Sequence, residues 1–213
     1  MCQSCLSWYA RCVTPYFVHF GCSANAFAHM RKRVIPLAQG TVVEVGFGSG
    51  LNLPYYDAAK VERLVGVDPD GTMLGLAAPK IHSMPFAVEC IRAGGESLPL
   101  ADGFADTVVV TYAFCTIPDP EAALAEIRRI LKPEGRLIFI EHGQAEGQRH
   151  RKWQDRLNRI WGQLAGGCQL NRNPLRLVGG AGFRLVHEER KRFPLPFWQL
   201  GSHYAGVALP PPS

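Results

Sequence analysis

The stretch TVVEVGFGSG, residues 41–50, decides how the rest of the chain is expected to fold. Its first half is rich in β-branched residues and is typical of a buried strand, and three alternate glycines follow. Without a Cβ, these glycines let the backbone turn sharply and approach a ligand closely. A dinucleotide site would need a further glycine where Leu51 stands, so that pattern is not met. The acid Glu44 beside the turn favours a nucleoside that carries an ammonium group.

A second acid, Asp68, follows the glycine turn at a spacing that suits a nucleoside site. Asp68 lies about 20 residues beyond the glycines, at the end of the next expected strand. A carboxylate there suits a ribose diol, because it accepts a hydrogen bond from each hydroxyl. The alternative interpretation is a helix cap or turn residue. Pro69 and Met73 follow closely, and Met73 is placed to pack against an adenine face.

The composition describes one ordinary globular domain. The chain has 213 residues, of which 47% are hydrophobic and 19% charged, so it can bury a core and is not expected to be disordered. The net charge of +5 gathers mainly in residues 31–33 and 149–159. Both clusters have too few interleaved aromatic residues for a nucleic-acid platform, so we interpret them as solvated helix faces and expect no nucleic-acid partner.

The cysteines indicate a reducing compartment. Their number, seven, is odd and they are scattered, so we expect free thiols and a cytoplasmic protein. Cys2 and Cys5 form a single C-x-x-C without a second pair, and no metal site is predicted. No secretory signal is expected, because the start lacks a basic region followed by an uninterrupted apolar stretch. No membrane span is expected, because the most apolar early segment, residues 13–30, is interrupted by Pro15, His19, Ser23 and Asn25. Contact with a membrane surface remains open.

Strand and helix patterns alternate along the chain. Strands are expected at 42–45, 63–68, 86–91, 107–112 and 136–141, and two final strands at 182–186 and 199–208. Helices are expected at 51–60, 70–78, 119–131 and 148–165, with a short one around 174–179. This order predicts an α/β fold, a mostly parallel sheet with helices on both faces. In the long helix 148–165, an apolar stripe is formed by Trp153, Leu157, Ile160, Trp161 and Leu164.

Taken in order, these motifs resemble those of the class I S-adenosylmethionine (SAM)-dependent methyltransferases. Residues 93–106 look like the family's loop that contacts the adenine, with Gly95 and Glu96 at matching positions and Gly94 where many relatives have Asp. Residues 131–135, LKPEG, look like its Leu-Lys-Pro-Gly-Gly motif. The resemblance covers about residues 40–142. It implies a Rossmann-like fold with a seven-stranded sheet, SAM as cofactor and S-adenosylhomocysteine as product.

The resemblance also implies where the cofactor binds, beyond the carboxyl ends of the strands. Thr111 and Tyr112 lie where the methionine part of SAM and the methyl acceptor should meet. The expected cofactor-binding residues are Glu44, Gly46, Phe47, Gly48, Gly50, Asp68, Pro69, Met73, Gly95, Glu96, Thr111 and Tyr112.

The last third of the chain resembles one subfamily of these methyltransferases. Residues 141–142, 153–154 and 167–172, with His203 and Gly206, look like the mammalian membrane-associated alkyl thiol methyltransferases and their soluble bacterial relatives. A thiol has a pKa near 8.5, so a small lipophilic thiol needs little base catalysis. The candidates for catalysis are His142, His203 and Tyr112, and those for the acceptor site are Cys115, Trp153, Cys168, Asn171 and Arg172. The alternative for each histidine is a structural hydrogen bond.

The N-terminal segment, residues 1–38, is expected to be helical in two pieces divided near Pro15. It is rich in aromatic residues, namely Trp8, Tyr9, Tyr16, Phe17, Phe20 and Phe27. It is interpreted as a helix packed on the sheet edge, as a lid over the acceptor pocket, or as both. The methyltransferase domain is expected at 39–209, followed by a disordered tail at 210–213.

Other functions remain open. Within enzymes, these are carbon methylation of a quinone precursor and nitrogen methylation of a phospholipid headgroup, for which the basic helix would help at an anionic membrane. A SAM-binding regulator without catalysis is the alternative from another class. A nicotinamide oxidoreductase is disfavoured by Leu51. The expected partner is a small-molecule acceptor. The chain is expected to be a monomer or a homodimer.

Overall fold

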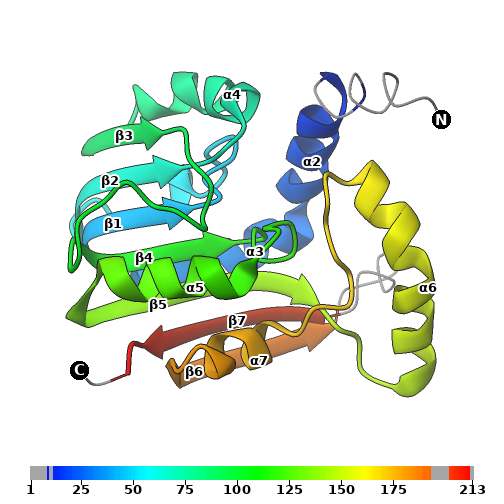
Figure 1. Cartoon of the computed structure of the whole chain (residues 1–213). Helices are drawn as coiled ribbons and strands as arrows, with labels where there is room; N and C mark the ends of the chain where they lie inside the picture. Colours follow the sequence, from blue (N-terminus) through cyan, green and yellow to red (C-terminus); the bar gives the residue numbers. More distant parts are fainter. Residues whose placement is uncertain (1–8, 10–11, 193–201, 212–213) are drawn as a thin grey trace.

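The computed structural model describes residues 9, 12–192 and 202–211, and they form a single sheet flanked by helices (Figure 1). The seven strands lie in the order β3-β2-β1-β4-β5-β7-β6. Their bounds are β1 Gly40–Val45, β2 Val61–Val67, β3 Ala87–Ile91, β4 Ala105–Thr111, β5 Leu131–Gly143, β6 Arg184–Arg192 and β7 Ser202–Leu209. The first five are parallel, and β7 runs antiparallel to both β5 and β6. The predicted fold class is therefore confirmed.

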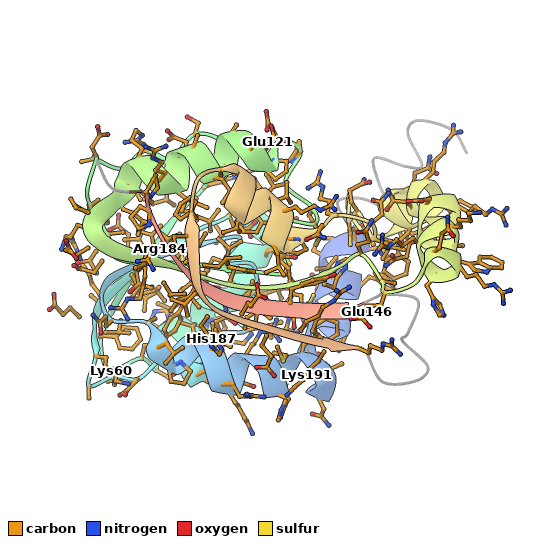
Figure 2. The ribbon with its side chains drawn as sticks, turned by 90° about the horizontal axis from the view of Figure 1, so that it is seen from below. Lys60, Glu121, Glu146, Arg184, His187 and Lys191 are labelled. Atoms are coloured by element: carbon orange, nitrogen blue, oxygen red, sulfur yellow. The ribbon has the colours of Figure 1, made fainter. Side chains whose placement is uncertain are left out.

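The central strands are buried on both faces because alternate residues enter different cores. Val108 and Val110 of β4 pack with Ile127 of α5, Pro120–Ile130. Val109, between them, lies in the opposite core with Met30 of α3, Asn25–Val34. Figure 2 shows α5 and α3 on opposite sides of the sheet. The continuous apolar run in β4 thus follows from its central position.

The other helices are α2 Thr14–Ser23, α4 Gly71–Ile81, α6 Gln148–Leu164 and α7 Pro174–Gly180, with 3₁₀ turns η1 Ile35–Leu37 and η2 Leu53–Tyr55. Two helices that follow strands begin at aspartates that cap them. Asp70 accepts a hydrogen bond from Thr72 N at 2.8 Å, and Asp119 accepts one from Ala122 N at 3.0 Å. Among the described residues, no helix has the length and hydropathy that crossing a membrane requires.

The helix predicted at 51–60 was wrong, since only the turn η2 forms there. The side chains on either side of η2 face inward and bond to Glu44. Asn52 Nδ2 donates to Glu44 Oε1 at 2.8 Å, and Tyr56 Oη donates to Glu44 Oε2 at 2.6 Å. Tyr56 itself has extended backbone angles, φ −68° and ψ 136°. These tertiary hydrogen bonds hold the segment as a turn, overriding its helical pattern.

The N-terminal helical segment divides beside Pro15, as predicted, since Cys12 is helical, Val13 is a turn and α2 begins at Thr14. Pro15 lies in the first turn of α2, where its missing N–H leaves no bond unmade. A second division, which was not predicted, lies at Ala24, whose ψ is 148°. The expectation for residues 1–8 and 10–11 lies outside the described residues. So do the start of the last predicted strand, 199–201, and half of the predicted tail, 212–213.

Two further boundaries differ from the sequence pattern. The segment 131–135 belongs to β5, which pairs with β4 at Leu131 and again at Arg136, so the residues between them bulge from the ladder. The strand β6 continues to Arg192, well beyond the predicted residue 186. Glu146, labelled in Figure 2, accepts hydrogen bonds from Arg192 at 2.8 and 3.1 Å and so ties the end of β6 to the segment after β5.

Candidate functional site

A cleft of about 740 Å³ opens at the carboxyl ends of β1, β2 and β4. It is lined by every predicted cofactor residue except Gly50. A second hollow of about 880 Å³ lies between α5 and α7, but none of the predicted cofactor-binding residues lines it. Because ligands of open α/β sheets bind beyond the strand ends, we assign the cofactor to the cleft.

The glycine turn needs its glycines. Gly46 and Gly48 have φ of 77° and 56°, in the left-handed region that side chains disfavour. A Cβ on Gly46 would lie 2.3 Å from the Cβ of Ala113, which cannot move aside. A Cβ on Gly48 would meet only the flexible end of Met73, at 3.3 Å. The first glycine is thus required for packing, and the second keeps the backbone open toward the cleft.

Asp68 is fixed at the cleft wall by two backbone donors. Its Oδ2 accepts from Gly48 N at 2.8 Å, and its Oδ1 accepts from Asp70 N at 2.9 Å. Burial raises the pKa of Asp68, and these two hydrogen bonds oppose the rise. Each carboxylate oxygen keeps a further lone pair for a ligand hydroxyl. The two interpretations of Asp68, turn residue and diol acceptor, are therefore compatible.

Glu44 belongs to a buried polar network that the sequence did not reveal. Asn52, which bonds to Glu44, also donates to Thr111 Oγ1 at 2.8 Å and accepts from Arg31 Nε at 2.9 Å. Burial raises the pKa of Glu44 to about 7, against the opposing hydrogen bonds of Tyr56 and Asn52. The network joins the first strand, the turn after the glycines and α3 around one end of the cleft.

The basic cluster 31–33 is not wholly a solvated face, as was predicted. Arg31 is only 4% exposed, and its Nη1 also donates to Cys22 O at 2.7 Å. Its guanidinium carbon lies 5.2 Å from the ring centre of Tyr112. Lys32 and Arg33 are exposed, as expected. The helical spacing that places Arg31 on the inner face of α3 can be seen in the sequence. Its partner Asn52 is distant in the sequence, so the buried contact could not be predicted.

The other end of the cleft is built by α2 and by the segment after α6. From α2 come Thr14, Pro15, Val18, His19 and Cys22, and from the end of α6 and beyond come Gly162, Gln163, Ala165, Gly166 and Gly167. The helix α2 thus lies over the cleft, the place expected of a lid. That it moves remains a prediction.

His19 and Cys22 were missed by the sequence interpretation. They lie three residues apart in α2 and therefore share a face, which was the available signal. His19 Nδ1 is hydrogen-bonded to Ser49 Oγ at 2.6 Å. Burial, together with the charge of Lys80, lowers the pKa of His19, so its imidazole is neutral at pH 7.

Of the predicted catalytic residues, Tyr112 lines the cleft and the two histidines lie behind it. Tyr112 Oη is hydrogen-bonded to His203 Nδ1 at 3.0 Å, and its ring packs edge-on against Phe27 at 4.7 Å. It is the one residue other than glycine with positive φ in the described part of the chain. Burial and neighbouring positive charge lower the pKa of His203 to about 3, so this imidazole is neutral.

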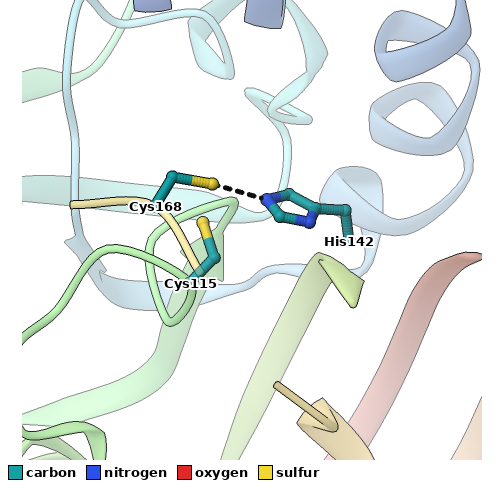
Figure 3. A group of neighbouring side chains, drawn as sticks. All are labelled: Cys115, His142 and Cys168. Atoms are coloured by element: carbon teal, nitrogen blue, oxygen red, sulfur yellow. Dashed lines mark hydrogen bonds between the residues drawn. The ribbon is translucent and has the colours of Figure 1, made fainter. Parts of the chain in front are cut away.

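His142 is grouped with the two predicted acceptor-site cysteines. Figure 3 shows Cys115, His142 and Cys168 pointing toward one another, with His142 Nε2 3.1 Å from Cys168 Sγ. All three side chains are buried and none is part of the cleft lining. Their sequence neighbours Ala113, Thr116 and Gly167 do line it. The group therefore lies directly behind the wall of the cleft.

The remaining predicted acceptor residues lie elsewhere. Trp153 is 54% exposed on α6, whose buried face is formed instead around Gln154. Asn171 Nδ2 donates to Asp155 Oδ1 at 2.8 Å. Arg172 Nη1 donates to the carbonyls of Phe114 and Ile117, bracing the loop after β4. None of these three predicted residues lines the cleft.

Comparison with known proteins gives the family. The sequence pattern described as a methyltransferase domain matches residues 43–139. Over 217 residues the chain is 28% identical to human thiol S-methyltransferase TMT1A, covering 95% of the chain and 88% of that protein. Demethylmenaquinone methyltransferase of Thermus thermophilus is 34% identical over 52% of the chain and 47% of its own length. Phosphatidylethanolamine N-methyltransferase of Cereibacter sphaeroides is 30% identical over 48% of the chain and 51% of its own length.

Solved structures share the fold. The YcgJ protein of Bacillus subtilis superposes with a TM-score of 0.69 at 15% identity, covering 88% of this chain and 99% of that one. Geranyl diphosphate methyltransferase in complex with SAM gives 0.68 at 14% identity, covering 88% and 85%. The cleft residues of this chain fit the same cofactor, with a hydroxyl-accepting carboxylate beside a glycine turn. The chain is therefore a class I methyltransferase, and S-adenosylmethionine is its cofactor.

Proposed function

We propose that this enzyme methylates a small, lipophilic acceptor and that the acceptor group is a thiol. The observation that carries the proposal is the character of the acceptor end of the cleft. Pro15, Val18, Ala113 and Ile117 make it largely apolar, and its imidazole, His19, is neutral. Such a site holds a lipophilic molecule and offers only weak base catalysis, which is enough for a thiol. The likeness to TMT1A over most of the chain supports the same acceptor class.

The chemistry is a displacement in line. When bound, SAM would supply an electrophilic methyl group, which the acceptor sulfur would take in line while the methyl–sulfonium bond broke and its electron pair stayed with S-adenosylhomocysteine. The protein contributes mainly alignment and exclusion of water. Asp68 would hold the ribose, the glycine turn would admit the nucleoside, and Tyr112 and α2 would enclose the acceptor.

A proton must leave the thiol, and three histidines are candidates to accept it. His19 lines the cleft, whereas His203 reaches it through the hydroxyl of Tyr112 and His142 lies behind Cys168. The predicted roles of His142 and His203 are thus indirect ones, as positioning residues. Separate His→Ala variants, assayed for the pH dependence of kcat/KM, distinguish them: replacing the proton acceptor removes the lower limb of the profile.

The decisive assay is methyl transfer from labelled SAM to matched panels of alkyl thiols, quinols and phosphatidylethanolamine vesicles. The proposal expects labelled thioether and S-adenosylhomocysteine in equal amounts. Transfer only to the quinol would indicate carbon methylation of a quinone precursor, and one relative is named demethylmenaquinone methyltransferase. Transfer only to the lipid would indicate nitrogen methylation, and another relative is named phosphatidylethanolamine N-methyltransferase. SAM binding with no transfer to any acceptor would favour a regulator.

We also propose that the enzyme contacts anionic membranes, from which lipophilic acceptors would enter. Both α2 and α6 line the cleft and lie at the same end of the sheet (Figure 1). Phe20 on α2 is 72% exposed, and Trp153 and Ile160 on α6 are 54% and 61% exposed. Five basic residues against one acid lie on α6. Exposed apolar side chains beside positive charge are typical of peripheral membrane contact.

Liposome sedimentation tests this contact. Binding to phosphatidylserine vesicles should exceed binding to neutral vesicles, weaken with salt, and be reduced by the pair Phe20→Ser and Trp153→Ser. The matched control is Val186→Ser, an exposed apolar residue on β6. Equal sedimentation of the pair and the control would refute the proposal.

A further inference from the structure

Three buried side chains behind the cleft form an unused group of soft ligand atoms. Cys115 comes from the loop after β4, His142 from the end of β5 and Cys168 from the loop after α6 (Figure 3). One ligand atom of each lies within 4.8 Å of those of the other two. Residues from three separate segments thus converge on one point.

The donor set and its spacing suit a zinc-like ion. Zinc takes thiolate sulfur at about 2.3 Å and imidazole nitrogen at about 2.0 Å in tetrahedral geometry. These bonds place neighbouring ligand atoms roughly 3.5–4 Å apart. The 4.8 Å limit and the 3.1 Å from His142 Nε2 to Cys168 Sγ enclose that spacing, so an ion fits with small side-chain shifts. Hard cations such as Mg²⁺ prefer oxygen ligands, which this group does not offer.

The backbone around the group aims the side chains inward. Glu141 Oε1 accepts from Ala113 N at 2.6 Å and Phe114 N at 2.7 Å, which fixes the loop that carries Cys115. Gly166 and Gly167, with φ of 63° and 91°, turn the chain just before Cys168. Ala165 and Trp161 pack against the two cysteines and keep water out. The site is therefore dry and preformed.

The imidazole of His142 makes a contact through only one of its two nitrogens in the described part of the chain. In the described part of the chain, His142 Nδ1 has no hydrogen-bond partner, so its ring is directed by what Nε2 meets. In the structure that partner is a thiol, a weak acceptor and donor. A metal ion bound by Nε2 and by both sulfurs would engage all three groups at once.

We propose that Cys115, His142 and Cys168 bind one thiophilic divalent cation, with Zn²⁺ as the favoured ion. Binding releases the two thiol protons to solvent and forms two metal–sulfur bonds and one metal–nitrogen bond. Three protein ligands leave one coordination position for water or another small donor. The ion ties together the segments whose residues Ala113, Thr116 and Gly167 line the acceptor end of the cleft, so it holds that wall in place. The proposal goes beyond the proposed function and does not depend on a thiol acceptor. It also departs from the absence of a metal site expected from the sequence.

The test measures metal binding by the reduced, chelator-treated protein. Because Cys2 and Cys5 also form a C-x-x-C, all variants are made in a background in which both are replaced by Ser. Equilibrium dialysis with Zn²⁺ should give one ion per chain, and Co²⁺ should show thiolate-to-metal charge transfer and tetrahedral visible bands. Cys168→Ser should weaken binding at least about 100-fold. Cys90→Ser removes an exposed thiol from β3 and is the matched control, expected to bind as the background does.

Several results would overturn the proposal. Equal affinity in the Cys168→Ser and Cys90→Ser variants would place the ion elsewhere. An ion lost completely with Cys2 and Cys5 would assign it to the N-terminus. A failure of the reduced background protein to bind Zn²⁺ or Co²⁺ would leave an ordinary buried cluster. SAM binding by calorimetry shows that each variant is folded, so loss of metal is not loss of structure.

Discussion

Removing the carboxylate of Asp68 tests the cofactor site most sharply. In the Asp68→Ala variant, a ribose diol loses two hydrogen bonds to a charged acceptor, each worth about 1.5–3 kcal/mol. The sum is roughly 3–5 kcal/mol when the acceptor is shared with two backbone donors, as it is here. Since about 1.4 kcal/mol is tenfold in affinity, SAM should bind about 100- to 4,000-fold more weakly. Calorimetric titration of SAM measures this directly.

The same substitution also removes acceptors for Gly48 N and Asp70 N, at a cost in stability of about 1–3 kcal/mol. Asp119→Ala is the matched control, because Asp119 is also an acid that accepts from backbone after a strand but does not line the cleft. It should lose about 1 kcal/mol of stability and bind SAM normally. An unchanged SAM affinity in Asp68→Ala, in folded protein, would refute the assignment of the diol to Asp68.

Three further predictions concern the surroundings of the cleft. Arg31→Ala should destabilise the fold by about 2–4 kcal/mol in urea unfolding, whereas Lys32→Ala next to it should change stability by less than about 0.5 kcal/mol; equal effects would contradict the buried network. Because the pKa of Glu44 is raised from 4.5 to about 7, the folded state binds more protons than the unfolded state between these values. Stability of the SAM-free protein should therefore fall by up to about 3 kcal/mol from pH 4.5 to 7, and a Glu44→Gln variant that kept the whole slope would refute this origin. Gly46→Ala should unfold the protein or lower Tm far more than Gly48→Ala, which costs about 1–2 kcal/mol for its left-handed backbone; the reverse order would contradict the close approach at the first glycine.

Features encoded by neighbouring residues were predictable from the sequence. The strand and glycine turn, Asp68 at the next strand end, the cap at Asp70 and the buried stripe of α5 all depend on contacts within a few residues or on a repeated strand–helix unit. The repetition predicts a mostly parallel sheet, and the resemblance to the methyltransferases implied its seven strands. Together with the family resemblance, these local rules were sufficient to predict the fold, and the predicted cofactor-binding residues other than Gly50 lie along one cleft.

Features made by distant partners were not predictable. Arg31 and Asn52 meet only after α3 packs on the sheet, and that contact converts an apparent surface residue into a buried one. The three ligands behind the cleft come from segments with no common motif. The apolar stripe of α6 is only partly covered, and Ile160 is 61% exposed, because the helix lies at the end of the sheet rather than across it.

A pair of acceptors with one carbon skeleton distinguishes methylation of a thiol from methylation of other groups. The initial rate of methyl transfer is measured for a lipophilic alkyl thiol and for the alcohol of the same shape. We expect transfer to the thiol alone, with a rate that increases as pH approaches the thiol pKa near 8.5. In Asp68→Ala, transfer should be lost at SAM concentrations that saturate the wild type. Equal transfer to both molecules, or transfer to neither by an enzyme that binds SAM, would refute thiol methylation.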